Sequence, residues 1–373
     1  MKREIEGLQE DIVQGLCGAG YTRAGSYTKP LVTSIGKVRI RVQRMRVACK
    51  ESIETFSPIL DALDIKKKVY ANDVRMKCSD LASVTSYGKA SEQFEKMTGI
   101  HVPKRTIHAF VQQIAPILKE ENRKHVQSKE LEHAVADGTK THSIYKTKNE
   151  VNVIIGSSNG EKVLLAASVN REWKDVGMEV NGILNNCDAL VRDADRSIAT
   201  NVADKTEHQL DLVHAVKETM IKLWSENMPK DERDTVSRKM SGILFTLVSS
   251  VRKHLDDGDI DAMKKRIEYT LEELKDLSKE LKRNDYVRAS EFIRKNARLM
   301  VTFAKLATES IRIPYTSNVI ERLMGEVARR CKHIWAHWST KGLENMLQIL
   351  LVKYCSPRFY EQFYKAYIAG MYN

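Results

Sequence analysis

The chain has 373 residues, of which 42% are hydrophobic and 29% are charged, so it has enough apolar residues for real cores and is not an intrinsically disordered chain. No apolar run reaches the roughly 18 residues of a membrane span, and the charged N-terminus lacks the apolar core of a signal peptide. We therefore expect a cytoplasmic protein without a membrane partner. Its net charge of +12 favours a polyanionic partner, most simply nucleic acid.

The positive charge is concentrated in the first third of the chain. Residues 1–128 hold 22 Lys and Arg against 14 Asp and Glu, which gives +8 of the total net charge. Between Asp11 and Glu51 there are eight basic residues and no acidic residue. Charge of one sign over this length favours contact with nucleic acid over a merely solvated basic face.

Residues 31–48 have the alternation of a basic β ribbon. Val38, Ile40 and Val42 alternate with basic residues, which predicts a strand with one apolar face and one basic face. The sequence 34–36, Ser-Ile-Gly, predicts a hairpin turn before it. Such a ribbon can lie along a phosphate backbone. The residues expected to make this contact are Lys37, Arg39, Arg41 and Arg44.

Residues 70–119 predict three helices, over about 72–83, over 89–97, and from after Pro103 to Leu118. Gly99 is typical of a helix end, and Pro103 is typical of a first helical turn. A supporting helix followed by two helices with a tight turn between them is a helix-turn-helix pattern, although an ordinary helical hairpin has the same appearance. In the first interpretation, Lys104 and Arg105 open the helix that reads DNA.

From residue 131 the pattern changes to a mixed α/β layout. Strand-like runs occupy 134–136, 151–155, 163–169 and 189–191, and an amphipathic helix fits 176–184. After His214 the pattern is helical, first as a block to about residue 310 and then over about 317–353.

Three acidic residues have positions that suit catalysis by metal ions. Asp137 ends the first strand-like run, Asp193 follows the fourth, and Glu321 lies on the late helix. Oxygen ligands suit Mg²⁺ or Mn²⁺, and two such ions are the usual means of cutting and joining phosphodiesters. The chain has 49 acidic residues, so these three alone are not specific. Asp195 competes with Asp193 as the second acid, and Glu326 competes with Glu321.

Short motifs around these acids give them a context. Asp211-Leu-Val-His214 begins 18 positions after Asp193, and Asn-Val-Ile-Glu-Arg-Leu at 318–323 precedes the basic pair Arg329 and Arg330. A Trp-Ser-Thr-Lys-Gly segment follows at 338–342. In this order and spacing, the motifs resemble those of the Mutator-type transposases of bacterial and archaeal insertion sequences.

The resemblance implies an α/β ribonuclease H-like catalytic core with an all-helical insertion, preceded by the basic strand and the helix-turn-helix. It implies DDE chemistry with two Mg²⁺ (or Mn²⁺) ions held by Asp137, Asp193 and Glu321. It also places a set of auxiliary residues near this site, and these are Asp211, His214, Asp195 and Trp338. Trp338 is either a core residue or a surface for stacking a displaced base. Arg329 and Arg330 are expected to contact DNA.

The implied domains are a DNA-binding region over 1–128 (ribbon 31–48, helix-turn-helix 70–119), a catalytic core over 129–215 plus 312–355, a helical insertion over 216–311, and a tail over 356–373. The implied function is a transposase that binds element ends and target DNA as a homodimer or larger homo-oligomer, associated with the nucleoid. A non-catalytic DNA-binding relative and a structure-specific nuclease remain as alternatives.

Overall fold

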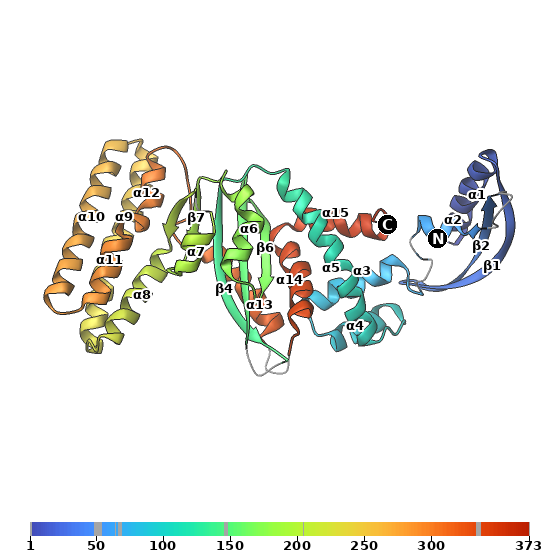
Figure 1. Cartoon of the computed structure of the whole chain (residues 1–373), viewed down its shortest axis with the longest axis horizontal. Helices are drawn as coiled ribbons and strands as arrows, with labels where there is room; N and C mark the ends of the chain where they lie inside the picture. The colour runs from blue at the N-terminus through green and yellow to red at the C-terminus, as the bar shows by residue number, and fades with distance from the viewer. Residues whose placement is uncertain are drawn as a thin grey trace. The chain divides into compact units, whose positions relative to one another are not determined.

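The structure is a computed structural model, which describes residues 2–47, 54–63, 65, 69–144, 148–203, 205–332 and 337–372, without the side chains of 2–4 (Figure 1). The chain divides into one unit of residues 1–122 and 345–373 and a second unit of residues 123–344. None of the described helices is both long and apolar enough to cross a lipid bilayer.

The first unit begins with an antiparallel hairpin. Its elements are α1 (Lys2–Gly18), β1 (Tyr21–Thr33), β2 (Gly36–Val47), β3 (Thr55–Phe56) and α2 (Pro58–Ala62). Ile40 and Val42 of β2 pack against Ile59 and Leu60 of α2, while the basic residues between them stay exposed. The predicted turn and the two-faced strand are therefore confirmed. The ribbon starts earlier than predicted, at Tyr21, and residue 48 lies outside the described residues.

The rest of the first unit is helical. Its elements are α3 (Asn72–Val84), α4 (Tyr87–Thr98), α5 (Lys104–Gln127), α14 (Thr340–Cys355) and α15 (Pro357–Ile368). The three predicted helices are confirmed, and Gly99 ends α4 in the left-handed conformation with φ of 69°. The segment predicted as a tail is instead a helix, because Tyr360, Phe363 and Tyr367 recur at helical spacing and are buried.

A mixed five-stranded sheet forms the centre of the second unit. Its strands are β4 (His133–His142), β5 (Lys148–Ser158), β6 (Glu161–Val169), β7 (Ala189–Arg192) and β8 (Glu207–Leu210). Their order is β6-β5-β4-β7-β8, with β4, β5 and β6 antiparallel and β4, β7 and β8 parallel. Two helices, α6 (Trp173–Leu184) and α7 (Arg196–Asn201), share an apolar core with the sheet. The four predicted strands are confirmed, but β8 and α7, which are short and mostly polar, were not predicted.

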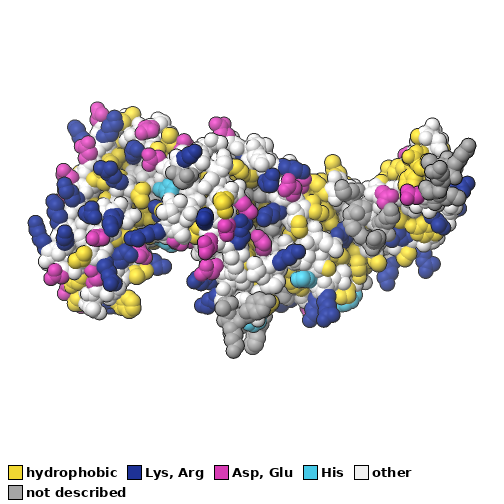
Figure 2. All heavy atoms as spheres, in the orientation of Figure 1, with side chains coloured by type: hydrophobic (Ala, Val, Ile, Leu, Met, Phe, Trp, Pro, Cys, Tyr) yellow, Lys and Arg dark blue, Asp and Glu magenta, His cyan; other side chains and the backbone are white. Residues whose placement is uncertain are grey.

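A block of helices follows the sheet, as predicted. Its members are α8 (Leu212–Ser225), α9 (Lys230–Asp257), α10 (Ile260–Arg283), α11 (Val287–Met300) and α12 (Thr302–Ala307). They enclose their own apolar core, while Lys and Arg mix with Asp and Glu on the outside (Figure 2). The chain then returns as α13 (Asn318–Cys331), which packs against β4. The fold is thus mixed α/β with a helical majority.

Candidate active site

Asp137 and Asp193 lie beside each other because their strands are neighbours. β4 and β7 run parallel, and the last pair in their register joins Ala136 to Arg192. The next residue of each strand is one of the two aspartates, so both emerge at the same edge of the sheet. The spacing of 56 positions in the sequence is closed by two antiparallel strands and α6.

Burial and mutual repulsion disfavour the charged form of Asp137. Burial raises its pKa to about 6, and the negative charges of Asp193 and Glu321 act in the same direction. The backbone N–H of Gly138, which donates to Asp137 Oδ1 at 2.7 Å, and the nearby His214 partly oppose this rise. The three acids named from the sequence therefore share one electrostatic neighbourhood.

Glu321 enters this neighbourhood from the first turn of α13, the helix that packs against β4. Its Oε1 lies 3.5 Å from Nε2 of His214, which is at the start of α8. Glu326, its competitor in the sequence, is 2.9 Å from Arg329 in an ion pair on the same helix. The geometry therefore favours Glu321 over Glu326 as the third acid.

Asp193 and Asp195 have different surroundings. Asp195 is the N-cap of α7, and its Oδ1 accepts hydrogen bonds from Ser197 N at 2.8 Å and Ser197 Oγ at 2.7 Å. Burial raises the pKa of Asp193, the charge of Asp195 adds to the rise, and the hydrogen bond that Asp195 N donates to Asp193 Oδ1 opposes it. Asp195 thus has a capping role, which favours Asp193 as the second acid.

Asp211 is buried, with 1% of its surface exposed, and it joins three elements. Its backbone N donates to the carbonyl of Arg192 at the end of β7. Its Oδ1 accepts from His214 N in α8, and its Oδ2 accepts from the N and Oγ of Ser317, just before α13. Because it caps α8 and anchors α13, Asp211 fixes the helices that carry His214 and Glu321.

Trp338 is a core residue in this structure, with 7% of its surface exposed. Its Nε1 donates to the carbonyl of Cys331 at 3.1 Å, and the guanidinium of Arg330 lies 5.0 Å from its ring centroid. Arg330 is itself only 9% exposed, whereas Arg329 is exposed. Of the two arginines expected to contact DNA, only Arg329 has an accessible side chain here.

No three His, Cys, Asp or Glu side chains among the described residues converge closely enough to form a ready-made metal site. Carboxylate oxygens are nevertheless the donors that Mg²⁺ and Mn²⁺ prefer. The metal-binding roles of Asp137, Asp193 and Glu321 stay a prediction.

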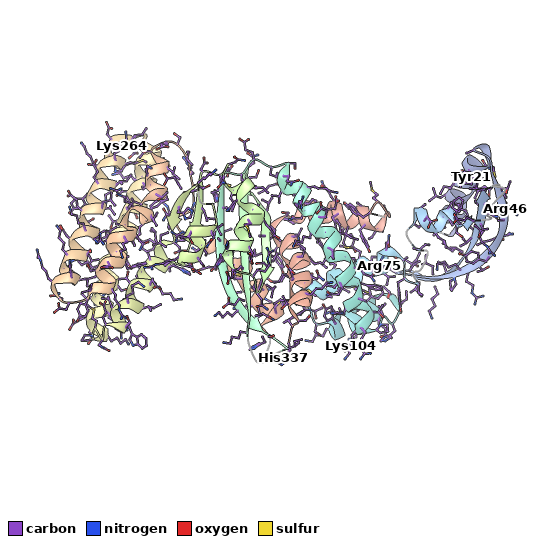
Figure 3. All side chains as sticks on the ribbon, in the orientation of Figure 1. Tyr21, Arg46, Arg75, Lys104, Lys264 and His337 are labelled. Carbon is purple, nitrogen blue, oxygen red and sulfur yellow. The ribbon has the colours of Figure 1, made fainter. Side chains whose placement is uncertain are left out.

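The basic residues named in the first unit are on exposed positions. Lys37, Arg39, Arg41 and Arg44 are exposed on β2, and Lys104 and Arg105 are exposed at the start of α5. The side chains of Arg41 and Arg46 are steadied by hydrogen bonds to Ser26 Oγ at 3.0 Å and Thr22 Oγ1 at 3.2 Å on β1. Figure 3 labels Arg46 on the hairpin and Lys104 on α5. Their contact with DNA stays a prediction.

Sequence reasoning missed a hydrogen-bonded pair next to Asp193, which is the buried Arg192 and the half-buried His208. The only signal was an Arg at the end of the otherwise apolar strand Ala-Leu-Val-Arg. It also missed a pocket of about 430 Å³ beside Asp193, whose lining includes Lys140, Arg171 and Lys174.

No curated protein matches the chain. A family model does match it, under the description "Transposase, Mutator family", over residues 17–356. The match spans the hairpin, the sheet with its acids, the helical block and α13, in line with the resemblance carried by the motifs. The chain belongs to the Mutator family of transposases.

Proposed function

We propose that this transposase is a DDE enzyme that binds the terminal repeats of its element, cleaves the element ends and joins them to target DNA. Membership of the family supports a transposase, and hence a DNA-processing enzyme, in general. The observation that carries the finer proposal is geometric: Asp137 and Asp193 follow paired residues of the parallel strands β4 and β7, and Glu321 lies on α13, which packs against β4.

The sheet supports a ribonuclease H-like core for this site. Three antiparallel strands are followed by two parallel strands on the other side of β4, so the first strand of the sheet is its centre. Asp137 lies on that central strand and Asp193 follows its parallel neighbour. This arrangement is what a DDE site on such a core requires.

We propose that Asp137, Asp193 and Glu321 hold two Mg²⁺ or Mn²⁺ ions. The donor set is all oxygen, and a nearby cation would offset the cost of ionising Asp137 and Asp193, whose pKa values burial raises. When bound, such ions polarise the scissile phosphate and activate the attacking oxygen.

The remaining work belongs to the chain itself. The sheet and α13 hold the three carboxylates in place, and His214 contacts Glu321 at 3.5 Å. In the first step, a water oxygen bonds to phosphorus and the bond from phosphorus to the 3′ oxygen breaks, which frees a 3′ hydroxyl. In the second step, that hydroxyl oxygen bonds to a target phosphorus and the target's own 3′ oxygen leaves. No covalent enzyme intermediate is needed.

We assign DNA binding to the exposed face of the hairpin and to the start of α5. Arg39 and Arg41 are two positions apart on β2, so they point to the same face about 7 Å from each other. The opposite face is covered by the apolar core with α2, which leaves the basic face free for a phosphate backbone. Lys104 and Arg105 open α5 as expected of a recognition helix. Joining two element ends implies at least a homodimer.

The test is nicking and joining of a duplex that carries the element's terminal repeat, which is found as short inverted repeats flanking the coding sequence. We expect nicking that needs Mg²⁺ or Mn²⁺ and is lost in Asp193→Asn. Asp195→Asn is the matched control, because it removes a neighbouring acid of the same size. Binding without any cleavage would instead identify a non-catalytic relative. Cleavage without strand transfer would identify a structure-specific nuclease.

A further inference from the structure

A buried arginine ends the strand that leads to Asp193. Arg192 is 4% exposed, and its guanidinium donates hydrogen bonds to an imidazole and to a backbone carbonyl. Its Nε donates to Nδ1 of His208 at 2.9 Å, and one terminal nitrogen donates to the backbone carbonyl of Asp193 at 2.8 Å. Burial lowers the pKa of Arg192, and the charges of Asp193 and Asp195 act against that change.

The hydrogen bond from Arg192 fixes the proton on His208. A guanidinium can only donate, so Nδ1 of His208 must accept, and the ring proton must sit on Nε2. That Nε2 lies 3.0 Å from the carbonyl of Ala203, to which it therefore donates. Burial lowers the pKa of His208, which keeps the ring in the neutral form that this arrangement needs.

The two contacts hold opposite ends of one segment, residues 193–203. Its first carbonyl, on Asp193, is held by Arg192, and its last, on Ala203, is held by His208. The segment contains the second acid, the cap of α7 and α7 itself. Ala203 has a φ of 53°, a left-handed conformation that costs energy for a residue with a side chain. The strained turn therefore depends on the contacts around it.

The same segment forms one wall of the pocket beside Asp193. Ser197, Ile198 and Asn201 line it together with Asp193, and Gly138 and Lys174 are among the residues on other walls. A shift of the segment would therefore move both the second acid and this wall. Asn181 of α6 also holds the far end, through Ala203 N and Asn201 O, so loss of His208 leaves that turn with partners.

We propose that Arg192 and His208 are positioning residues, which fix segment 193–203 at both ends and so aim Asp193 at the neighbouring Asp137. The proposal rests on the proposed function for its effect on catalysis. The two contacts that hold the ends of segment 193–203, which we call the clamp, are a property of the fold. They can be tested without any reaction.

The first experiment compares two variants of His208 in the full chain. His208→Gln can keep both contacts, because its oxygen accepts from Arg192 and its nitrogen donates to Ala203, whereas His208→Leu can make neither. We expect hydrogen exchange in peptides covering 193–203 to become at least tenfold faster in the Leu variant and to stay within about threefold of wild type in the Gln variant. Equal exchange in all three proteins would overturn the clamp. Equal acceleration in both variants would do the same.

The second experiment measures nicking and DNA binding in the same proteins. We expect the nicking rate of His208→Leu to fall about 10- to 100-fold, as is typical when an outer partner of a metal ligand is lost, while DNA affinity without metal stays within twofold. His208→Gln should recover most of the rate. A loss of rate in the Gln variant as large as in the Leu variant would reject positioning through these hydrogen bonds.

One further variant and one further comparison distinguish failure of the clamp from failure of the proposed function. Arg192→Lys keeps the charge but cannot make both contacts, so it should behave like His208→Leu even if the latter folds poorly. If wild type shows no metal-dependent cleavage, the proposed function fails, while the exchange result still decides the clamp. If the clamp fails, Asp193→Asn still tests the proposed function.

Discussion

Asp211 and Ser317 are 106 positions apart, yet Oδ2 of Asp211 accepts two hydrogen bonds from Ser317, from N and from Oγ, each at 2.6 Å. Both residues are buried, with 1% and 2% of their surface exposed. Ser317 directly precedes α13, so this contact ties the start of α8 to the start of the helix that carries Glu321. In the motif Asp-x-x-His, Asp211 therefore has a structural role, whereas His214 contacts the acid Glu321.

The first prediction concerns the stability of this contact. Asp211→Ala leaves the buried N–H groups of His214 and Ser317 and the hydroxyl of Ser317 without their acceptor, so unfolding free energy should fall by about 3–5 kcal/mol. Ser317→Ala removes only one donor and should cost about 1–2 kcal/mol. Urea denaturation of both variants measures the difference. Equal losses of unfolding free energy in the two variants would contradict the conclusion that the Asp211 carboxylate holds all three donors.

The second prediction concerns the cost of ionising Asp137. Its pKa is raised to about 6 from an ordinary value of 3.8, so the folded protein holds the proton more tightly than the unfolded chain. The contribution of protonated Asp137 to the stability of the folded protein is complete below pH 3.8 and is lost as pH rises through about 6. Asp137→Asn should therefore be more stable than wild type at pH 7.5, by about 1–3 kcal/mol, and equally stable near pH 4.

Thermal unfolding at the two pH values, without divalent metal, measures this effect. Adding Mg²⁺ at pH 7.5 should raise the melting temperature of wild type and leave that of Asp137→Asn unchanged, because the variant lacks one oxygen ligand and its charge. A stabilising effect of Mg²⁺ of equal size in both proteins would place the ion elsewhere.

The third prediction separates the two acids that compete in the sequence. Asp193→Asn should abolish nicking, while Asp195→Asn should retain activity within about tenfold and nearly all of its stability, because the Asn oxygen can still cap α7. Single-turnover nicking and denaturation of both variants give the comparison. The reverse pattern of activity would assign the second ligand to Asp195.

The fourth prediction concerns the hairpin. The double variant Arg39→Gln, Arg41→Gln should weaken binding to duplex DNA and lower the slope of log affinity against log salt by about 2, one for each lost phosphate contact. The matched control is Arg283→Gln with Arg294→Gln, two exposed arginines of the helical block. Fluorescence anisotropy at several salt concentrations measures both. A control that changes the slope as much as the hairpin variant would indicate diffuse binding by net charge.

Periodicity was enough to predict the elements that are long or strongly patterned. The alternation at Val38, Ile40 and Val42, the three helices within 70–119 and the helical block were predicted in this way, whereas α1, α2 and α15 were not. The strand β8, Glu-His-Gln-Leu, and the helix α7, Arg-Ser-Ile-Ala-Thr-Asn, are short and mostly polar, so neither has an apolar pattern that stands out from the flanking sequence. Their positions follow from packing, through Asn181 and Ala203 among others, and no local sequence signal reveals such contacts.

The three acids were predicted from the order and spacing of the motifs around them, whereas their positions relative to one another depend on the register of the strands. The sequence alone left Asp193 and Asp195 open, because both follow a strand and both precede a helix. The contact that separates them is the capping bond from Ser197 N to Asp195. Arg192 could not be recognised as buried either, since a charged residue at a strand end is usually a surface residue.

The chain leaves the sheet at Leu212 and returns at Tyr315, and the N–H of the former donates to the carbonyl of the latter at 3.1 Å. The roughly one hundred residues between them therefore form a segment whose two ends lie beside each other. The distance between Asp193 and Glu321 does not depend on the length of this segment. A relative could have a shorter, longer or different segment here, and the two acids would keep the same separation.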